Sequence, residues 1–183
     1  MKKISDRVLC EGKWLIFKEA VYENRDGRPV VWEYIERKHS SDTVVIIPKL
    51  VPSNRYVLIK QFRCALDNYV IGFPAGIKAD GGGDPLDELR EETGYFGKIV
   101  GESPRLSTSS GVMDSSTVLF YVEIDESDPR NIAPHQDLEP EEDITVFILE
   151  KEKIAGFLER ESAKGTSIGS GVWAFFFGRE ANA

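Results

Sequence analysis

Apolar and polar residues alternate along the first third of the chain, which is typical of half-buried strands. The alternation over residues 14–38, around the turn-like cluster at 24–28, predicts a β-hairpin. Two β-rich runs at 43–48 and 56–62, separated by Pro-Ser-Asn at 52–54, predict a second hairpin. The start of the chain is therefore expected to be rich in antiparallel sheet.

A short helix is expected to follow a Pro/Gly-rich loop. Asp84 suits the N-cap, Pro85 suits the first helical position, and Gly94 is a natural stop. Further strands are expected at 70–73, 117–124 and 144–149, and helical segments at 151–163 and 172–177. Strands on both sides of one short helix, with more helices at the end, predict an α+β fold in which a mixed sheet lies between helices.

The short helix separates acidic from apolar residues. At about 100° per residue, Glu88, Glu91 and Glu92 fall within about one third of the circumference, whereas Leu86 and Leu89 point to another side. Like charges three and four residues apart cost about 0.2–0.5 kcal/mol per pair, so the arrangement requires a cation or some other compensation. Carboxylate oxygens suit Mg²⁺ or Mn²⁺, and the spacing therefore indicates a candidate metal site.

Composition narrows the class of protein. The 183 residues, 41% hydrophobic and 30% charged, fit one globular domain better than two. No long apolar run or secretory start occurs, so we expect a cytoplasmic protein with no membrane partner. The two cysteines, Cys10 and Cys64, are expected to be free thiols. A net charge of −8 argues against nucleic-acid binding, although a local basic pocket or a bound cation can still hold phosphates.

The acidic helix and the Pro-Ala-Gly loop before it resemble the signature box of the Nudix hydrolases. Gly76 matches the leading glycine of the box, and Glu88, Glu91, Glu92 and Gly94 match its tail at the same relative spacing. The resemblance implies a Nudix-like α/β/α sandwich, with residues 1–42 as an N-terminal antiparallel β extension and dimerisation region. Residues 43–183 would then form the catalytic domain.

The box departs from the family pattern in three ways. The first glutamate of the pattern falls on Gly82, its arginine falls on Asp87, and the stretch from Gly76 to Glu88 is three residues short. Either the helix has lost about one turn or the recorded sequence omits a short stretch, and both interpretations stay open. In addition, Gly72 stands where many members carry glutamate. A true deletion would misdirect the start of the helix more than its Glu88–Glu92 face.

The resemblance assigns metal ligands. Glu88, Glu92 and the backbone carbonyl of Ala75 would hold one Mg²⁺, with Mn²⁺ as an alternative, and Glu91 would help to hold a second ion. Metal ions are needed because the closely spaced charges of a diphosphate repel an attacking water.

A general base is expected on an acidic loop before a late strand. Glu142 is the first candidate, and Glu141 and Glu139 are alternatives in the same loop. The competing interpretation is that residues 137–143 form only a solvated acidic loop.

Residues outside the box look like the ADP-sugar diphosphatase branch of the family, and the likeness extends from Trp14 to Trp173. Arg63 of Gln-Phe-Arg and Arg37 of Trp-Glu-Tyr-Ile-Glu-Arg would bind phosphate or ribose, unless they form ordinary salt bridges. Trp14 and Trp32 match tryptophans that sandwich adenine, one from each subunit, which implies a homodimer. The alternative interpretation is that the two tryptophans lie in the core or in an interface and do not bind adenine.

The implied activity is Mg²⁺-dependent hydrolysis of the diphosphate of an ADP-sugar, with ADP-ribose giving AMP and ribose 5-phosphate. Ser110 replaces a proline that many ADP-ribose hydrolases carry, which weakens the choice of ADP-ribose itself. One alternative is a hydrolase of another nucleoside diphosphate compound, such as GDP-mannose or NADH. Another is a catalytically weakened Nudix domain that binds a nucleotide.

Overall fold

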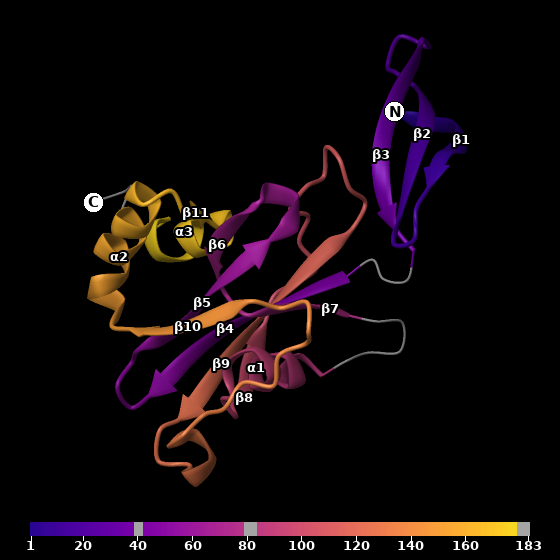
Figure 1. Ribbon diagram of the computed structural model, residues 1–183. Coiled ribbons are helices and arrows are strands. Elements are labelled where there is room, and N and C mark those ends of the chain that lie inside the picture. The colour runs from indigo at the N-terminus through magenta and orange to yellow at the C-terminus, as the bar shows by residue number, and fades with distance from the viewer. Residues whose placement is uncertain (39–41, 79–83, 179–183) are drawn as a thin grey trace. The chain divides into compact units, whose positions relative to one another are not determined.

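The computed structural model describes residues 1–38, 42–78 and 84–178, and the chain divides into two compact units (Figure 1). The first unit comprises Met1–Val44, Ile77–Gly83 and Ser103–Val118. The second unit comprises Val45–Gly76, Asp84–Glu102 and Leu119–Ala183. The position of the box at Gly82 lies outside the described residues.

The first unit contains a three-stranded antiparallel sheet of β1 (Lys2–Glu11), β2 (Leu15–Glu23) and β3 (Pro29–Arg37) in that order. The predicted hairpin of β2 and β3 is confirmed. Its turn is held by the Asn24 side chain, which accepts from the N–H groups of Asp26 and Arg28, both at 2.9 Å. Strand β1 was not expected, because all of its residues are exposed and a strand without a buried face imposes no clear alternation.

A loop at residues 103–118 belongs to the same unit and pairs with β3. Ile35 N–H donates to the Val112 carbonyl at 2.7 Å, and the Trp32 indole N–H donates to the Gly111 carbonyl at 3.2 Å. The loop and the outer strand of the sheet are thus joined by main-chain and side-chain bonds.

The second unit is organised by an eight-stranded mixed sheet with the order β11-β6-β5-β4-β9-β8, in which β10 also pairs with β5 and β7 with β4. Its mixed character comes from the parallel pair β11–β6 beside the antiparallel pair β10–β5. Short 3₁₀ turns, Cys64–Leu66 and Pro129–Asn131, lie in two of its connections. The strands are β4 (Asp42–Val51), β5 (Tyr56–Arg63), β6 (Asn68–Gly72), β7 (Ala75–Lys78), β8 (Lys98–Glu102), β9 (Ser116–Asp125), β10 (Ile144–Leu149) and β11 (Ser167–Ile168).

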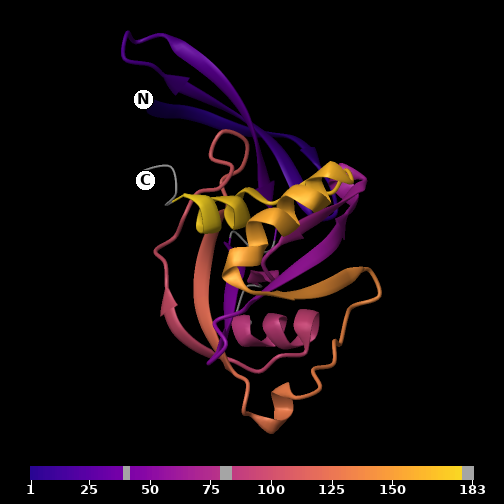
Figure 2. The ribbon, with the colours of Figure 1, turned by 90° about the vertical axis from the view of Figure 1, so that its left-hand side faces the viewer.

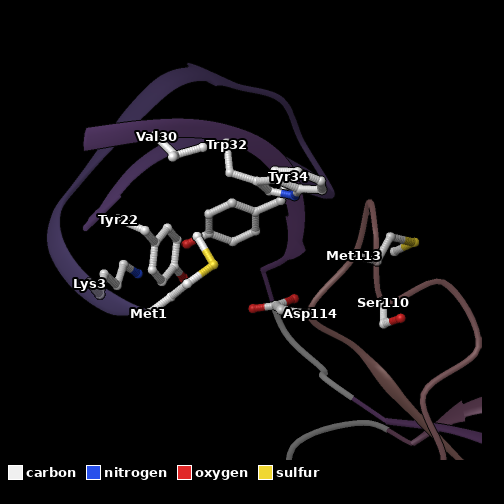
Figure 3. Close-up of a pocket in the computed structure, with 9 residues that line it drawn as sticks. All are labelled: Met1, Lys3, Tyr22, Val30, Trp32, Tyr34, Ser110, Met113 and Asp114. Carbon is white, nitrogen blue, oxygen red and sulfur yellow. The ribbon is translucent and has the colours of Figure 1, made fainter. Parts of the chain in front are cut away.

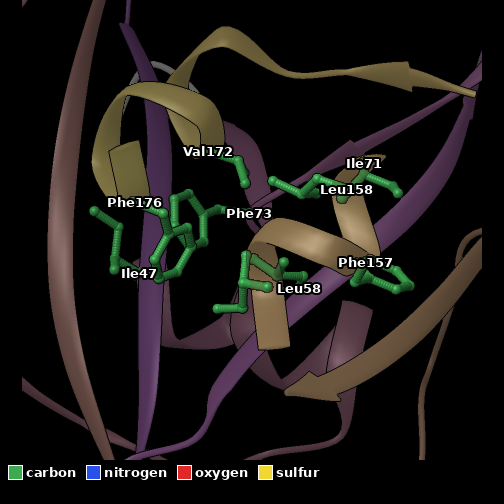
Figure 4. Packing of buried hydrophobic residues seen from close by; sticks show 9 residues of the cluster. Ile47, Leu58, Ile71, Phe73, Phe157, Leu158, Val172 and Phe176 are labelled. Carbon is green, nitrogen blue, oxygen red and sulfur yellow. The ribbon is translucent and has the colours of Figure 1, made fainter. Parts of the chain in front are cut away.

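Helices cover both faces of this sheet, which confirms the predicted α/β/α sandwich (Figures 1 and 2). Helices α2 (Lys151–Ala163) and α3 (Ser170–Phe177) pack on one face, and α1 (Pro85–Thr93) lies on the other. The predicted extent of α2 is confirmed. Figure 4 shows the core under α2 and α3, which consists of Ile47, Leu58, Ile71, Phe73, Ile154, Phe157, Leu158, Val172 and Phe176.

Helix α1 begins and ends where the sequence predicts. The Asp84 carboxylate accepts from Leu86 N–H at 2.9 Å, and Pro85 is the first helical residue. At the other end Gly94 has φ 78° and donates its N–H to the Arg90 carbonyl at 2.7 Å. A Cβ at Gly94 would lie 2.3 Å from the backbone nitrogen of His135, so both conformation and space require glycine there.

Strand β7 is an addition to the prediction. The Pro-Ala-Gly segment was expected only as a loop, yet Ala75–Lys78 pairs with β4 and the Pro74 carbonyl accepts from Ile46 N–H at 2.8 Å. This pairing fixes the backbone that faces the acidic helix.

Cys10 and Cys64 are exposed free thiols, as predicted. Among the described helices, none has the length and apolarity needed to cross a bilayer.

Candidate active site

Glu92 is the innermost acid of α1. It is 1% exposed, and its Oε2 accepts from the Ala75 N–H of β7 at 3.0 Å. Leu89 and Glu92 are both buried, so the predicted separation of acids from leucines on this helix does not hold for this pair, because residues three apart lie only about 60° apart. The Ala75 N–H of β7 meets the Glu92 carboxylate. The structure therefore places the Glu92 carboxylate in the interior, where its Oε2 accepts the Ala75 N–H.

Burial sets the protonation of Glu92. Its pKa is raised to about 8, first by burial and then, against the lowering effect of the Ala75 N–H, by the nearby charges of Glu142 and Glu88. The charge of Arg63 acts in the opposite direction, which places that guanidinium near the same carboxylate. A buried acid surrounded by other acids would be stabilised in its charged form by a cation.

Glu88 lies against the backbone of the Pro-Ala-Gly segment. A Cβ built on Gly76 would be 2.0 Å from both Cδ and Oε1 of Glu88. The absence of a side chain at Gly76 is therefore what gives the Glu88 carboxylate its place. The pKa of Glu88 is raised, first by burial and then by the charges of Glu91 and Glu142.

Glu91 is turned differently. Its Oε1 lies 3.2 Å from the Arg90 guanidinium, its side chain is 41% exposed, and Arg90 also lies 3.4 Å from Asp87. The structure thus brings Glu88 and Glu92 together with Ala75 and pairs Glu91 with Arg90. Within residues 1–38, 42–78 and 84–178, no three acids, histidines or cysteines are grouped as a metal site.

The donor chemistry at Glu88, Glu92 and Ala75 fits a hard divalent cation. Two carboxylates and a nearby backbone carbonyl are oxygen ligands of the type that Mg²⁺ takes, with water completing its coordination. The pKa values of Glu88 and Glu92 are raised, and at Glu92 burial and the neighbouring acids outweigh the Ala75 N–H and the charge of Arg63. A bound cation would supply that compensation.

The acidic loop presents Glu142 to this group. Its charge raises the pKa of both Glu88 and Glu92, whereas Glu139 affects Glu88 and Glu141 is exposed. Glu139 and Glu142 close a turn on each other: Glu142 N–H donates to the Glu139 carbonyl, and Glu139 N–H donates to Glu142 Oε2, both at 3.0 Å. Of the three predicted candidates, Glu142 has the strongest electrostatic link to the acids of α1.

Two glutamines near the site were not given a role by sequence reasoning. Gln136 Nε2 donates to the Glu92 carbonyl at 2.7 Å and to the Ile144 carbonyl at 3.3 Å, which ties the end of α1 to β10. Gln61 is 8% exposed, and its Oε1 has no hydrogen-bond partner among the described residues. Gln61 belongs to the Gln-Phe-Arg run, in which only Arg63 was given a role. Gln136 could not be predicted, because its partners are backbone atoms of distant residues.

The first unit holds an aromatic pocket of about 540 Å³, in which Figure 3 shows the rings of Tyr22, Tyr34 and Trp32. Trp32 is 51% exposed, so its ring stays accessible although its N–H is bonded to Gly111. Lining residues include Tyr22, Val30, Trp32 and Tyr34 of the sheet and Met113 and Asp114 of the loop.

Trp14 and Arg37 do not line the pocket. Trp14 is 63% exposed, with Lys13 Nζ 4.5 Å above its ring. In the part of the chain that the structure describes, the buried Nε of Arg37 has no hydrogen-bond partner, which leaves a donor for a ligand.

Comparison with known proteins identifies the class. The chain is 33% identical over 140 residues to a mouse protein named ADP-sugar pyrophosphatase, covering 71% of this chain and 64% of the relative. It is 31% identical over 172 residues to the ADP-ribose pyrophosphatase of Saccharomyces cerevisiae, covering 87% and 74%. It is also 28% identical over 180 residues to an uncharacterized Nudix hydrolase of Schizosaccharomyces pombe, covering 93% and 88%. No family model matches the chain.

Together with the α/β/α sandwich and the acidic helix, these relatives define the class of the protein. The chain belongs to the Nudix hydrolase family, in the branch whose members include ADP-ribose and ADP-sugar pyrophosphatases. The chain spans less than two thirds of the mouse relative and 74% of the yeast relative. Activity and substrate are therefore matters for a proposal.

Proposed function

We propose that this chain hydrolyses the diphosphate of an ADP-sugar in the cytoplasm, with ADP-ribose giving AMP and ribose 5-phosphate, and that it requires Mg²⁺. The observation that carries the proposal is the buried Glu92 carboxylate, whose pKa is raised to about 8 by burial and by acidic neighbours. Such a group is costly unless a cation joins it. The names of the mouse and yeast relatives support the choice of an ADP-sugar.

The residues of α1 and β7 would hold the metal. Glu88, Glu92 and the Ala75 carbonyl provide oxygen ligands for one ion, and Glu91 would contribute to a second after leaving Arg90. The bound cation would neutralise the diphosphate oxygens and so reduce the repulsion of an attacking water.

Glu142 would act as the general base, with Glu141 and Glu139 as alternatives in the same loop. The carboxylate accepts a proton from water as the water oxygen forms a bond to phosphorus and the bridging phosphorus–oxygen bond breaks. Glu139 N–H holds one oxygen of Glu142, which restricts the rotation of the carboxylate.

Substrate binding is proposed for four residues outside α1. The guanidinium groups of Arg63 and Arg37 would bind phosphate or ribose, which the unpartnered Nε of Arg37 supports. Trp14 and Trp32 would stack on adenine, supported by the exposed ring of Trp32 in its aromatic pocket. We also propose that residues 1–42 form the contact of a homodimer with residues 43–183 as the catalytic domain.

A second candidate function is a nucleotide-binding Nudix domain with weakened catalysis. The pairing of Glu91 with Arg90 favours it, as does the shortened box. A third candidate keeps the chemistry but takes another diphosphate compound, such as GDP-mannose or NADH. Stacking on tryptophan favours a purine without selecting one.

The test is an assay of phosphate-product release from ADP-ribose, other ADP-sugars, GDP-mannose and NADH, with Mg²⁺ and with EDTA, beside Glu92→Gln. ADP-ribose should be cleaved fastest, and both EDTA and the substitution should abolish the reaction. No turnover of any compound would exclude the hydrolase proposals. Calorimetric titration with ADP-ribose would then decide the binding-domain alternative, and unchanged tryptophan fluorescence on binding would count against stacking.

A further inference from the structure

A polar network on the α2 face of the sheet reaches the end of the acidic loop. The Tyr69 hydroxyl of β6 donates to Asp143 Oδ2, and the Phe62 N–H of β5 donates to the Asp143 carbonyl at 3.1 Å. Asp143 lies between Glu142 and the first residue of β10. Tyr69 therefore holds the residue next to the candidate general base.

The ring of Tyr69 is itself held from two directions. Phe62 packs on it edge to face, with ring centroids 5.3 Å apart and an interplanar angle of 74°. Lys60 Nζ lies 5.5 Å from the centre of the Tyr69 ring and 2.8 Å from Glu161 Oε2 of α2. These contacts connect the rigid α2 helix through β5 and β6 to the end of the loop.

Asp143 and Glu142 interact with groups on opposite faces of the sheet. The Asp143 carbonyl accepts from Phe62 N–H directly beside the pair Ile144 and Gln61, so Asp143 lies opposite Phe62, on the face that Phe62 shares with its partner Tyr69. Asp143 meets Tyr69, whose ring lies beside Lys60 on the α2 face, whereas the charge of Glu142 acts on Glu88 and Glu92 of α1. Fixing Asp143 on one face thus directs Glu142 toward the other.

We propose that Tyr69 is a positioning residue that orients Glu142 by binding the Asp143 carboxylate. This inference rests on the proposed function, because it assigns Glu142 the role of base. Glu142 is also held by the turn that it forms with Glu139. Asp143 links this turn to the sheet.

Loss of the Tyr69 hydroxyl should affect catalysis more than folding. Asp143 is exposed, so water can replace the hydroxyl as its hydrogen-bond donor and the stability of the fold changes little. A displaced base, by contrast, lowers the rate because proton transfer depends on geometry. The hydrogen bond to Asp143 also raises the pKa of Tyr69 above its ordinary value of 10.

The kinetic test compares Tyr69→Phe with the control Tyr121→Phe, which removes a hydroxyl from a 38% exposed tyrosine of β9. For hydrolysis of ADP-ribose, Tyr69→Phe should lower kcat about tenfold and leave KM within about twofold, a smaller loss than removal of a general base. Asp143→Ala should match it, and Asp143→Asn, which keeps an acceptor oxygen, should recover most of the rate. The double variant Tyr69→Phe/Asp143→Ala should lose no more than either single variant.

A second measurement does not depend on activity. Amide hydrogen exchange of the peptide that spans residues 137–143 should become several-fold faster in Tyr69→Phe and stay unchanged in Tyr121→Phe. In Tyr69→Phe the Asp143 side chain loses its bond to the sheet, and the backbone bond from Phe62 N–H remains. Unchanged exchange, or equal kcat in the two variants of an active enzyme, would overturn the inference. If the parent protein cleaves no compound, the proposed function fails, and the exchange rates still decide whether Tyr69 holds the loop.

Discussion

Two buried glutamates on opposite faces of one sheet have opposite kinds of partner. On the α2 face, Glu161 is 6% exposed and lies 2.6 Å from Lys164 Nζ and 2.8 Å from Lys60 Nζ. On the α1 face, Glu92 is 1% exposed, and the bond that the structure gives it is from the neutral Ala75 N–H. The first acid forms ion pairs with two lysines of the protein, whereas the charges near the second are those of Glu142, Glu88 and Arg63, and within the described ranges none of these forms an ion pair with it.

The pKa values follow from these partners. Lys164 and Lys60 lower the pKa of Glu161 to about 2, whereas burial raises that of Glu92 to about 8. Burial alone therefore does not distinguish a structural acid from a site acid. The distinction lies in whether the protein supplies the compensating charge, and on the α1 face a bound cation would supply it.

The largest expected effect comes from neutralising each acid in turn. Glu92→Gln should lower the rate of ADP-ribose hydrolysis by about 10³-fold, about 4 kcal/mol in activation free energy, because a metal ligand is lost. Its free energy of unfolding without metal should not decrease, because a neutral amide replaces a buried acid. Glu161→Gln is the matched control and should keep activity within about twofold. Equal losses in the two variants would end the distinction between the faces.

The second effect concerns the backbone next to Glu88. Gly76→Ala should lower kcat by about ten- to one hundredfold. The new Cβ would lie 2.0 Å from Cδ and Oε1 of Glu88, so the carboxylate has to move. The melting temperature should change little, because the displaced atoms are the end of a flexible side chain. Gly72→Ala is the control, since nothing lies within 4 Å of its Cβ. Full activity in Gly76→Ala would show that Glu88 is not needed in this position.

The third effect is a pH dependence that belongs to the α2 face. The pKa of Glu161 falls from its ordinary value of 4.5 to about 2 in the folded protein. Its ion pairs therefore stabilise the fold fully above pH 4.5, and this contribution is lost as the pH falls from 4.5 toward 2. Urea unfolding should show that Glu161→Gln costs about 1 kcal/mol at pH 7 and less at pH 3. A constant difference between pH 7 and pH 3 would contradict this assignment.

The smallest effect separates the two lysines that pair with Glu161. Lys164 is 67% exposed, so Lys164→Ala should cost no more than about 0.5 kcal/mol of unfolding free energy, whereas the less exposed Lys60 should cost more on the same substitution. Raising the salt concentration should reduce the effect of Lys164→Ala first. A larger cost for Lys164→Ala would mean that water screens this pair less than its exposure implies.

Much of α1 was predictable because its signals are local. Asp84, Pro85 and Gly94 set its ends through their own backbone chemistry, and the spacing of Glu88 and Glu92 gave the acidic face. The orientation of Glu91 was not predictable in this way. Its partner Arg90 is adjacent in sequence, and helical spacing alone gives no reason to expect that pairing.

The ties between distant segments required the tertiary structure. Gln136 donates to the carbonyls of Glu92 and Ile144, and Tyr69 donates to Asp143. These partners belong to different elements, so the periodicity of helices and strands does not predict the bonds. Strand β1 escaped prediction for a different reason, since an exposed strand leaves no apolar pattern. Local signals predicted elements, whereas non-local hydrogen bonds decided how the candidate base and the acids are held.

The sequence by itself determined the family, the α/β/α architecture and the acids of α1, because caps, periodicity and spacing depend on neighbouring residues. Only the tertiary structure decided that Glu92 lies in the interior beside Ala75 while Glu161, an equally ordinary glutamate in a helix, is neutralised by two lysines. The physical reason is that the cost of a buried charge depends on what surrounds it, and those surroundings come from strands and helices far apart in the chain.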